Sequence, residues 1–297
     1  MEPRTRKIPA LVVSGFLGSG KTTLVRHLLE SAQRAGIRVA VVSNELGELG
    51  IDRALLGSGG EAFVELAGGC VCCELSNDLI ETLQMLRDRV DPDRIVIETS
   101  GVALPFDTTL NFWRLPVSTW IGDDTAVVVV NAEQLAEGWN LEGTFEDQVS
   151  SADLLVLNKV DLVDPEDVPA LEAKLREIEP EAPIVTSVHG RVASELLFPP
   201  DLSPPGISRE RGAEAPAVPP HHHEMFRSSV WNVPPGISPE ELERALRRPG
   251  LLRAKGWAQT SAGPMLVQVV GRRVEQVRQP PPDPALLGRI VLIERAS

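Results

Sequence analysis

The stretch Gly15-Phe16-Leu17-Gly18-Ser19-Gly20-Lys21-Thr22-Thr23 decides the fold of this chain and has the spacing G-x-x-x-x-G-K-[ST]. Its glycines allow turn conformations that bring backbone N–H groups close to an anion. Lys21 would supply a positive charge to the β- and γ-phosphates of a nucleotide, and the hydroxyl of Thr22 would bind Mg²⁺. A helix beginning near Lys21 would present its positive end to the same phosphates. We therefore predict that the phosphates are bound by Gly15, Gly18, Ser19, Gly20, Lys21, Thr22 and Thr23.

The residues on either side of this loop predict a strand, a helix and a second strand. Residues 10–14 form a short apolar run, and Leu24, Leu28, Leu29 and Ala32 share one helical face. Residues 37–42 follow as another apolar run that is typical of a buried parallel strand. This βαβ unit predicts an α/β fold, namely a P-loop NTPase domain with a mostly parallel sheet flanked by helices.

Composition narrows the partners and the compartment. The chain has 297 residues, with 29 lysines and arginines against 42 aspartates and glutamates, and its formal net charge is -13. This acidic balance argues against nucleic-acid or anionic-membrane partners. No apolar run reaches the length of about 18 residues that a membrane helix needs, so we expect a cytoplasmic protein. All three cysteines lie within four positions, which indicates a reducing compartment rather than a disulfide framework.

The cysteines form a compact candidate metal site. Gly68-Gly69-Cys70-Val71-Cys72-Cys73 precedes a predicted helix whose apolar face contains Leu79, Leu83 and Leu86. A helix N-terminus favours thiolate, and thiolates select zinc or Cu(I), with cobalt and nickel as alternatives. Three sulfurs leave zinc one open tetrahedral position, so the metal would be exchangeable. Buried apolar cysteines and Cys-x-Cys redox chemistry are the competing interpretations.

Two acidic segments lie beside the phosphate loop in the expected sheet. The segment 44–52 follows the second strand and contains three carboxylates, which would either hold a metal or form a solvated loop. Residues 94–98 form another strand that ends in Glu98, and Gly101 follows closely. Glu98 could bind Mg²⁺ through water or position the attacking water, and the N–H of Gly101 could contact the γ-phosphate. We therefore expect Lys21, Glu98 and Gly101 to be the catalytic residues.

A second motif predicts the base. Asn158-Lys159-Val160-Asp161 directly follows an apolar strand at 153–157, as in the guanine-binding motif of P-loop GTPases. Asp161 would accept two hydrogen bonds from guanine, Asn158 would brace the loop and reach N7, and the stem of Lys159 would cover the ring. Adenine lacks the matching donors, so the site would discriminate against it. Ser187 ends a further predicted strand, where backbone N–H groups could reach guanine O6.

Together these motifs resemble the CobW-type GTPases, which are relatives of the nickel-inserting accessory GTPases of urease and hydrogenase. The resemblance covers roughly the first 190 residues, and its motifs are G-F-L-G-S-G-K-T-T-L at 15–24, N-E-L-G-E-L-G-I-D at 44–52, G-G-C-V-C-C at 68–73, E-T-S-G at 98–101 and N-K-V-D at 158–161. It implies a GTP-hydrolysing metallochaperone, most often for zinc and in some branches for cobalt or iron. It also implies that Cys70, Cys72 and Cys73 hold the metal, with Glu48 as a further candidate ligand.

Two positions depart from the pattern of this family. Asn131 stands where many relatives have aspartate, and Ser43 stands where some have an acidic residue. The first difference is compatible with a purely structural role. The second puts any additional metal ligand from that strand in doubt.

The second half of the chain predicts a linker and a smaller domain. Residues 198–224 are rich in proline and end in His221, His222, His223 and Glu224. This tract is either a weaker metal site or a solvated linker. Beyond it, strand patterns and a capping box at Ser238 to Glu241 predict a small α+β domain. The expected domains are thus 1–197 for nucleotide binding, 198–224 as linker and 225–297 as the C-terminal domain.

Three functions follow as hypotheses. The first is a GTPase that uses GTP, Mg²⁺ and Zn²⁺ and delivers zinc, or another metal such as cobalt, to a client protein. Its GTP hydrolysis would be slow unless the client or a nucleotide-dependent homodimer activates it. The second is a nucleotide-gated metal sensor or switch that regulates without delivering metal. The third is a small-molecule kinase, which the N-K-V-D motif and the cysteines argue against.

Overall fold

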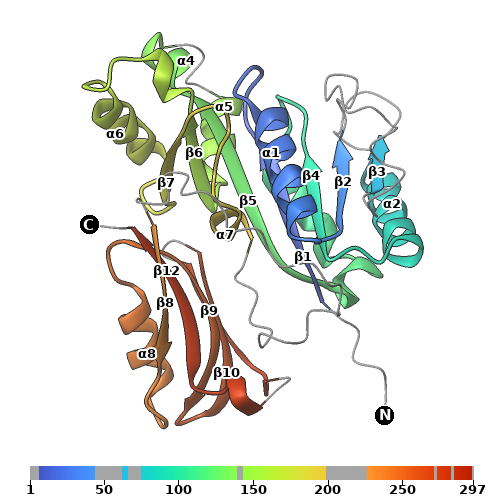
Figure 1. Cartoon of the computed structure of the whole chain (residues 1–297), viewed down its shortest axis with the longest axis vertical. Helices are drawn as coiled ribbons and strands as arrows, with labels where there is room; N and C mark the ends of the chain where they lie inside the picture. Colours follow the sequence, from blue (N-terminus) through green and yellow to red (C-terminus); the bar gives the residue numbers. More distant parts are fainter. Residues whose placement is uncertain are drawn as a thin grey trace. The chain divides into compact units, whose positions relative to one another are not determined.

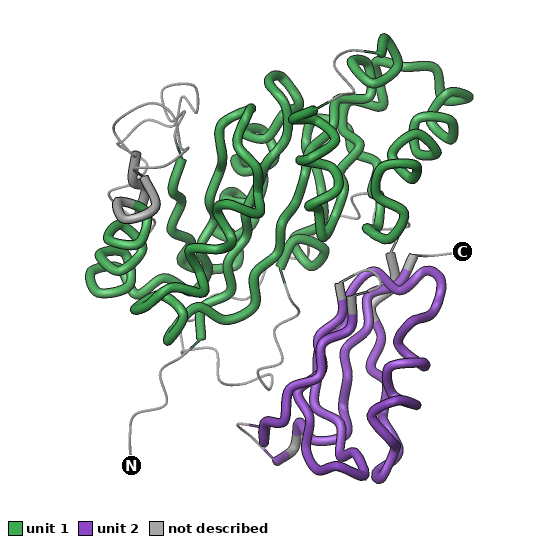
Figure 2. The backbone as a smooth tube through the Cα atoms, turned by 180° about the vertical axis from the view of Figure 1, so that it is seen from behind, with its two compact units in different colours: residues 1–198 green, residues 199–297 purple. Residues whose placement is uncertain are grey.

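The computed structural model describes residues 7–43, 62–65, 75–138, 143–198, 226–270, 273–281 and 284–295. The chain forms two compact units, residues 1–198 and 199–297 (Figure 2). None of the helices in these described ranges is long and apolar enough to cross a membrane.

The first unit is built on one parallel sheet (Figure 1). In its described part, seven strands pair in the order β3-β2-β4-β1-β5-β6-β7, and every pairing is parallel. The strands are β1 (Ile8–Ser14), β2 (Val39–Ser43), β3 (Ala62–Glu65), β4 (Arg94–Glu98), β5 (Ile121–Asn131), β6 (Leu154–Asn158) and β7 (Ile184–Ser187). Their valine-rich sequences suit a sheet that is covered on both faces. The predicted α/β fold with a mostly parallel sheet is confirmed.

Helices connect these strands and cover the sheet (Figure 1). They are α1 (Lys21–Arg34), α2 (Leu75–Arg89), α3 (Pro105–Thr109), α4 (Ala132–Ala136), α5 (Thr144–Ser150), α6 (Val168–Ile178) and α7 (Ser194–Leu197). Leu79, Leu83 and Leu86 of α2 are buried against β1, β2 and β4, as the apolar spacing predicted. The short helices α3, α4 and α5 were not predicted from the sequence, because each is too short to show a clear apolar period.

The strand register gathers polar residues at the carboxyl edge of the sheet. Ser43 pairs with Glu98, and Asn131, Asn158 and Ser187 occupy one row across β5, β6 and β7. All five side chains are buried. Ligands of open α/β sheets bind at this edge, so the register brings the predicted site residues to one place.

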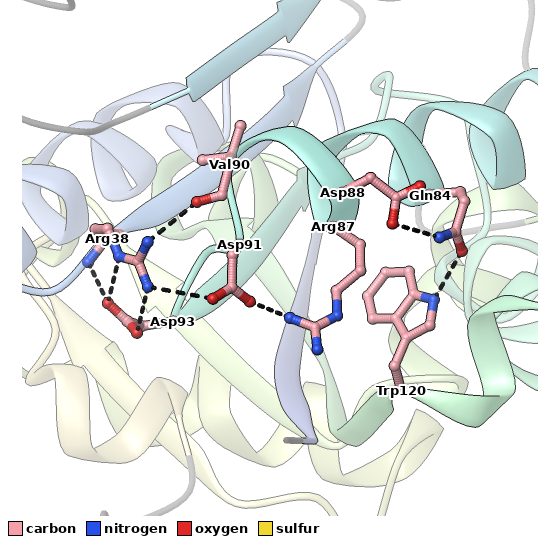
Figure 3. A network of polar contacts seen from close by, with 8 residues as sticks. All are labelled: Arg38, Gln84, Arg87, Asp88, Val90, Asp91, Asp93 and Trp120. Atoms are coloured by element: carbon pink, nitrogen blue, oxygen red, sulfur yellow. Dashed lines mark hydrogen bonds and ion pairs between the residues drawn. The ribbon is translucent and has the colours of Figure 1, made fainter. Parts of the chain in front are cut away.

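A polar network lies at the opposite, amino end of the strands (Figure 3). Arg38 donates from its backbone N–H to Asp93 Oδ2 at 2.9 Å, and Arg87 pairs with Asp91. Nearby, Trp120 Nε1 donates to Gln84 Oε1 at 3.0 Å, and Gln84 Nε2 donates to Asp88. These bonds tie α2 to the starts of β2, β4 and β5, far along the sheet from the carboxyl edge.

The first unit ends at Phe198, one residue beyond the boundary expected from composition. Phe198 is 1% exposed, and the guanidinium of Arg94 lies 4.6 Å from the centre of its ring. This contact combines apolar burial with cation–π attraction, which composition alone does not indicate.

The second unit is a small antiparallel sheet with one described α-helix. In the described part, five strands pair in the order β11-β10-β9-β12-β8. The elements are β8 (Phe226–Asn232), α8 (Pro239–Leu246), β9 (Leu251–Thr260), β10 (Gly263–Val270), β11 (Arg273–Arg278) and β12 (Arg289–Arg295). Leu242 and Leu246 of α8 pack with Ala254, Val267 and Ile290 of the sheet. The predicted small α+β domain is confirmed.

The predicted capping box begins α8. Ser238 Oγ accepts a hydrogen bond from the Glu241 N–H at 3.1 Å, and Glu241 Oε2 accepts one from the Ser238 N–H at 3.1 Å. Hydrogen bonds from Ser238 to the Glu241 carboxylate lower the pKa of Glu241, the backbone N–H of Ser238 having the largest effect. The stabilisation that follows from the lowered pKa is therefore present above the pKa of the unfolded chain and is lost as the pH falls through the folded pKa.

We expect Ser238→Ala to destabilise the second unit by about 1 kcal/mol, because the N–H at Glu241 loses its capping acceptor. Thermal unfolding of the full chain would detect this as a lower midpoint for the transition of that unit. Ser261→Ala, in the exposed turn between β9 and β10, is the matched control and should leave the midpoint unchanged. Equal midpoints for both variants would contradict the role of the cap.

Candidate nucleotide site

The phosphate loop has a backbone that requires glycine at two positions. Gly15 has φ +136°, and a Cβ there would lie 2.2 Å from the carbonyl oxygen of Val129. Gly20 has φ +101°, and a Cβ there would lie 2.4 Å from Nδ2 of Asn158. Both the left-handed conformation and the lack of space exclude other residues. The loop is therefore a tight cradle, and its shape depends on its neighbours in the sheet as well as on its own sequence.

Lys21 is the first residue of α1 and is only 4% exposed. Its Nζ donates to the carbonyl oxygen of Gly15 at 2.9 Å and to that of Phe16 at 3.4 Å. The ammonium group therefore lies against the loop that precedes α1. No side chain caps the N-terminus of α1, so its first N–H groups suit an anionic ligand.

Thr22 and Glu98 are brought together from elements far apart in the sequence. Thr22 Oγ1 donates to Glu98 Oε1 at 2.6 Å, and Ser43 Oγ lies 3.5 Å from Glu98 Oε2. Glu98 is 3% exposed at the end of β4. A hydroxyl and a carboxylate beside a phosphate cradle form the oxygen donor set that Mg²⁺ prefers. These residues therefore fit a nucleotide-bound magnesium ion.

Asn158 links the phosphate loop to the expected base-binding side. Its Nδ2 donates to the carbonyl oxygen of Ser19 at 2.8 Å, and its Oδ1 accepts from the Gly190 N–H at 2.9 Å. Asn158 is 1% exposed, so these bonds are shielded from water. Asn158 therefore connects the phosphate loop to the loop after β7.

The remaining residues of the base motif are accessible. Lys159 adopts a left-handed conformation with φ +62° and is partly exposed, and the Asp161 side chain is exposed. The sharp turn at Lys159 leads the chain out of the buried strand, which leaves the Asp161 carboxylate in solvent. Ser187 is buried, and its Oγ donates to the carbonyl oxygen of Arg191 at 3.2 Å. Ser187 thus shapes the loop after β7.

The structure explains the asparagine at position 131. Asn131 Oδ1 accepts from the N–H groups of Glu133 and Gln134, which caps α4, and its Nδ2 donates to the Gly18 carbonyl oxygen at 3.4 Å. Gln134 Nε2 donates to the Leu17 carbonyl oxygen at 3.3 Å. The sequence patterns do not indicate Gln134, because a glutamine in a short helix carries no signal by itself.

The predicted metal ligands Cys70, Cys72, Cys73 and Glu48 lie outside the described residues, as do His221, His222 and His223. The cysteine stretch joins β3, which ends at Glu65, to α2, which begins at Leu75. Among the residues that the structure does describe, no group of three or more His, Cys, Asp or Glu side chains is arranged to hold a metal ion.

The parallel sheet, the glycine cradle and the Thr22–Glu98 pair define a P-loop nucleotide-binding protein. Comparison with known protein families identifies the family within this class. Residues 9–186 match the family model described as the CobW/HypB/UreG nucleotide-binding domain, and residues 226–297 match that of the cobalamin synthesis protein CobW C-terminal domain. The chain belongs to the CobW family of P-loop GTPases.

Several known proteins are similar to this chain. A zinc chaperone CobW from Sinorhizobium sp. is 33% identical, with 91% of this chain and 87% of that protein aligned. A zinc chaperone CobW from Pseudomonas aeruginosa is also 33% identical, over 91% of this chain and 82% of its own length. The crystal structure of the Zn(II)-bound YjiA GTPase from E. coli has a TM-score of 0.53 at 25% identity, covering 98% of this chain and 95% of that one.

Proposed function

We propose that this chain is a GTP-hydrolysing metallochaperone that binds Zn²⁺ through Cys70, Cys72 and Cys73 and transfers it to a client protein. The observation that carries the GTPase part is the brace formed by Asn158. A single buried side chain bonds both to the phosphate loop at Ser19 and to the loop after β7 at Gly190. The two halves of a guanine nucleotide site are thereby held at a fixed spacing. The zinc part is supported by relatives that are zinc chaperones.

Hydrolysis would use the residues at the carboxyl edge of β1 and β4. The N–H groups of the cradle and the Lys21 ammonium would bind the β- and γ-phosphates, which stabilises the charge that develops on them. Bound magnesium would supply further neutralisation of that charge, held by Thr22 Oγ1 and by Glu98 directly or through water. Glu98 would orient the attacking water, and the Gly101 N–H would contact the γ-phosphate.

Guanine specificity would come from Asp161. Its carboxylate is exposed in a turn whose start is fixed by Asn158 and by the left-handed Lys159. It can therefore accept from guanine N1–H and the exocyclic amine at once. A carboxylate has no donor for the N1 acceptor of adenine.

Zinc and nucleotide would be coupled through the edge of the sheet. The segment 44–61 leaves β2 after Ser43, which contacts Glu98, and the cysteine stretch leaves β3 in the next position of the same sheet. Both segments therefore start at the edge where the nucleotide phosphates would bind. Occupancy of the γ-phosphate position can then bias the segments that carry Glu48 and the cysteines.

The test of this coupling is zinc affinity measured by chelator competition, with a non-hydrolysable GTP analogue and with GDP. We expect the two affinities to differ on the order of tenfold, which is typical of coupling between two sites. Adding a candidate client in the presence of GTP should then release the zinc. Equal affinities would remove the coupling, and zinc retained in the presence of the client would favour a sensor over a chaperone.

Cys72→Ser should remove most of the bound zinc, because a hydroxyl is a much poorer ligand than a thiolate at neutral pH. The measurement is metal analysis of anaerobically purified wild-type and variant protein, which also identifies the metal. Ser261→Ala is the control, since it changes an exposed turn of the second unit and should retain zinc. Equal zinc content in the wild type and Cys72→Ser would contradict the three-thiolate site.

The division of the chain follows the same proposal. Residues 1–197 would bind and hydrolyse GTP, residues 198–224 would act as a linker, and residues 225–297 would form the C-terminal domain. A client, or a second copy of the chain that binds in a nucleotide-dependent way, would accelerate the reaction.

A further inference from the structure

Gln148 is a fully buried polar residue that is hydrogen-bonded to the turn containing Gly101. It lies on α5 and is 0% exposed. Its Nε2 donates to the carbonyl oxygen of Gly101 at 3.1 Å and to that of Ala103 at 3.0 Å. Its Oε1 is buried without a hydrogen-bond partner in the described part of the chain. Since both neighbours are carbonyl oxygens, only the nitrogen of the amide can face them.

The backbone that Gln148 holds is a tight turn directly after β4. The Ala103 N–H donates to the Ser100 carbonyl oxygen at 3.2 Å, which closes the turn around Gly101. Because a peptide group is planar, this bond also sets the direction of the Gly101 N–H. Ser14 Oγ adds a second bond to the Ala103 carbonyl oxygen at 3.1 Å. Gln148 and Ser14 thus hold the turn through hydrogen bonds to its carbonyl oxygens.

The phosphate loop also contacts this turn. A Cβ at Gly101 would lie 2.7 Å from Cγ of Leu17 and 3.0 Å from its backbone nitrogen. Gly101 is therefore in direct contact with the cradle, and the turn has no space to approach it further. The turn thus contacts Leu17 of the phosphate loop and is hydrogen-bonded to the amide of Gln148.

We propose that Gln148 is a positioning residue for the γ-phosphate. It acts through Gly101 and does not itself touch the nucleotide, and this inference rests on the proposed GTPase function. GDP has no γ-phosphate, so the interaction affects only the triphosphate state. Gln148 would thereby contribute to the discrimination between GTP and GDP and to the hydrolysis rate.

The unpartnered Oε1 indicates that the contribution of this amide comes from its nitrogen. A buried oxygen without a donor lowers the stability of the fold, because it loses its hydrogen bonds to water. An apolar side chain of similar length would avoid that loss. The two hydrogen bonds from Nε2 to the Gly101 and Ala103 carbonyl oxygens therefore explain why an amide occupies this position.

The test is Gln148→Met, which keeps the length of the side chain and removes both bonds to the turn. We expect kcat for GTP hydrolysis to fall about tenfold, and affinity for a non-hydrolysable GTP analogue to fall by a similar factor relative to GDP. Affinity for GDP should stay within about twofold of wild type. Titrations with fluorescent nucleotides and single-turnover phosphate release measure these quantities.

The matched control is Gln84→Met, which removes hydrogen bonds to Trp120 and Asp88 at the amino end of the sheet (Figure 3). It should leave kcat and both affinities unchanged. If Gln148→Met does not fold, Ser14→Ala is the alternative variant, because it removes the hydrogen bond from Ser14 to the Ala103 carbonyl oxygen of the same turn. It should also lower affinity for the GTP analogue relative to GDP, but by a smaller factor.

Two outcomes would overturn the inference. The first is a wild-type value for both kcat and the affinity ratio in Gln148→Met, and the second is an equal loss of GTP and GDP affinity. In either case GTP hydrolysis by the wild type would leave the proposed function intact. If the wild type neither binds nor hydrolyses GTP, the proposed function itself fails and the inference fails with it.

Discussion

Asp161→Asn should weaken GTP and GDP binding on the order of 100-fold, because the site loses a charged acceptor for two donors of guanine. The amide oxygen of asparagine can still accept from N1–H, but its NH₂ group faces the exocyclic amine, and two donors repel. Since Asp161 is exposed, the substitution should leave the fold unchanged. Competition against a fluorescent GDP measures the loss.

Xanthosine nucleotides provide the decisive comparison for this variant. Xanthine carries a carbonyl oxygen where guanine carries the amine, so the asparagine NH₂ group gains a partner that the aspartate repels. We therefore expect Asp161→Asn to bind XDP more tightly than GDP, which reverses the wild-type order. A variant that keeps the wild-type preference for GDP would exclude Asp161 from base recognition.

Glu98→Gln should lower kcat for GTP hydrolysis on the order of 100-fold, the usual range for a carboxylate that orients water or acts on a proton. The carboxylate accepts from Thr22 Oγ1 at 2.6 Å and is 3% exposed, so its replacement changes charge at the centre of the site. Glutamine keeps the volume and one oxygen, which limits the effect on the fold. Single-turnover hydrolysis at saturating GTP measures the change.

Two further measurements test the role of Glu98: the dependence of the hydrolysis rate on Mg²⁺ and the rate of the neighbouring variant Ser43→Ala. The Mg²⁺ concentration for half-maximal rate should rise in Glu98→Gln, because the site loses a negative charge. Ser43→Ala is the matched control, since Ser43 Oγ lies 3.5 Å from Glu98 Oε2, at the outer limit of a hydrogen bond. A rate within about twofold of wild type in Glu98→Gln would show that Glu98 has no role in hydrolysis.

Sequence patterns predicted the elements of the fold well where the signal is local. The strand ending at Glu98, the capping box at Ser238 and the apolar face at Leu79, Leu83 and Leu86 all lie where the sequence analysis expected them. Each depends on residues within a few positions of one another. The short helices α3 and α5 were not predicted, since five to seven residues are too few to show a period.

The sequence by itself determined the chemistry of the candidate site. The glycines, Lys21 and Thr22 of the phosphate loop predict a phosphate cradle, and the spacing of Asn158 and Asp161 predicts a guanine acceptor. This is possible because conformational limits at glycine and the donor and acceptor groups of side chains are properties of single residues and their nearest neighbours.

Only the tertiary structure decided how these parts work together. Thr22 meets Glu98 from 76 positions away, Asn158 meets Ser19 from 139, and Gln148 meets Gly101 from 47. Such contacts depend on the order and register of the strands, because a parallel sheet aligns chain segments that are remote in sequence. A buried glutamine on a short helix has no local pattern, and its partners follow from packing alone.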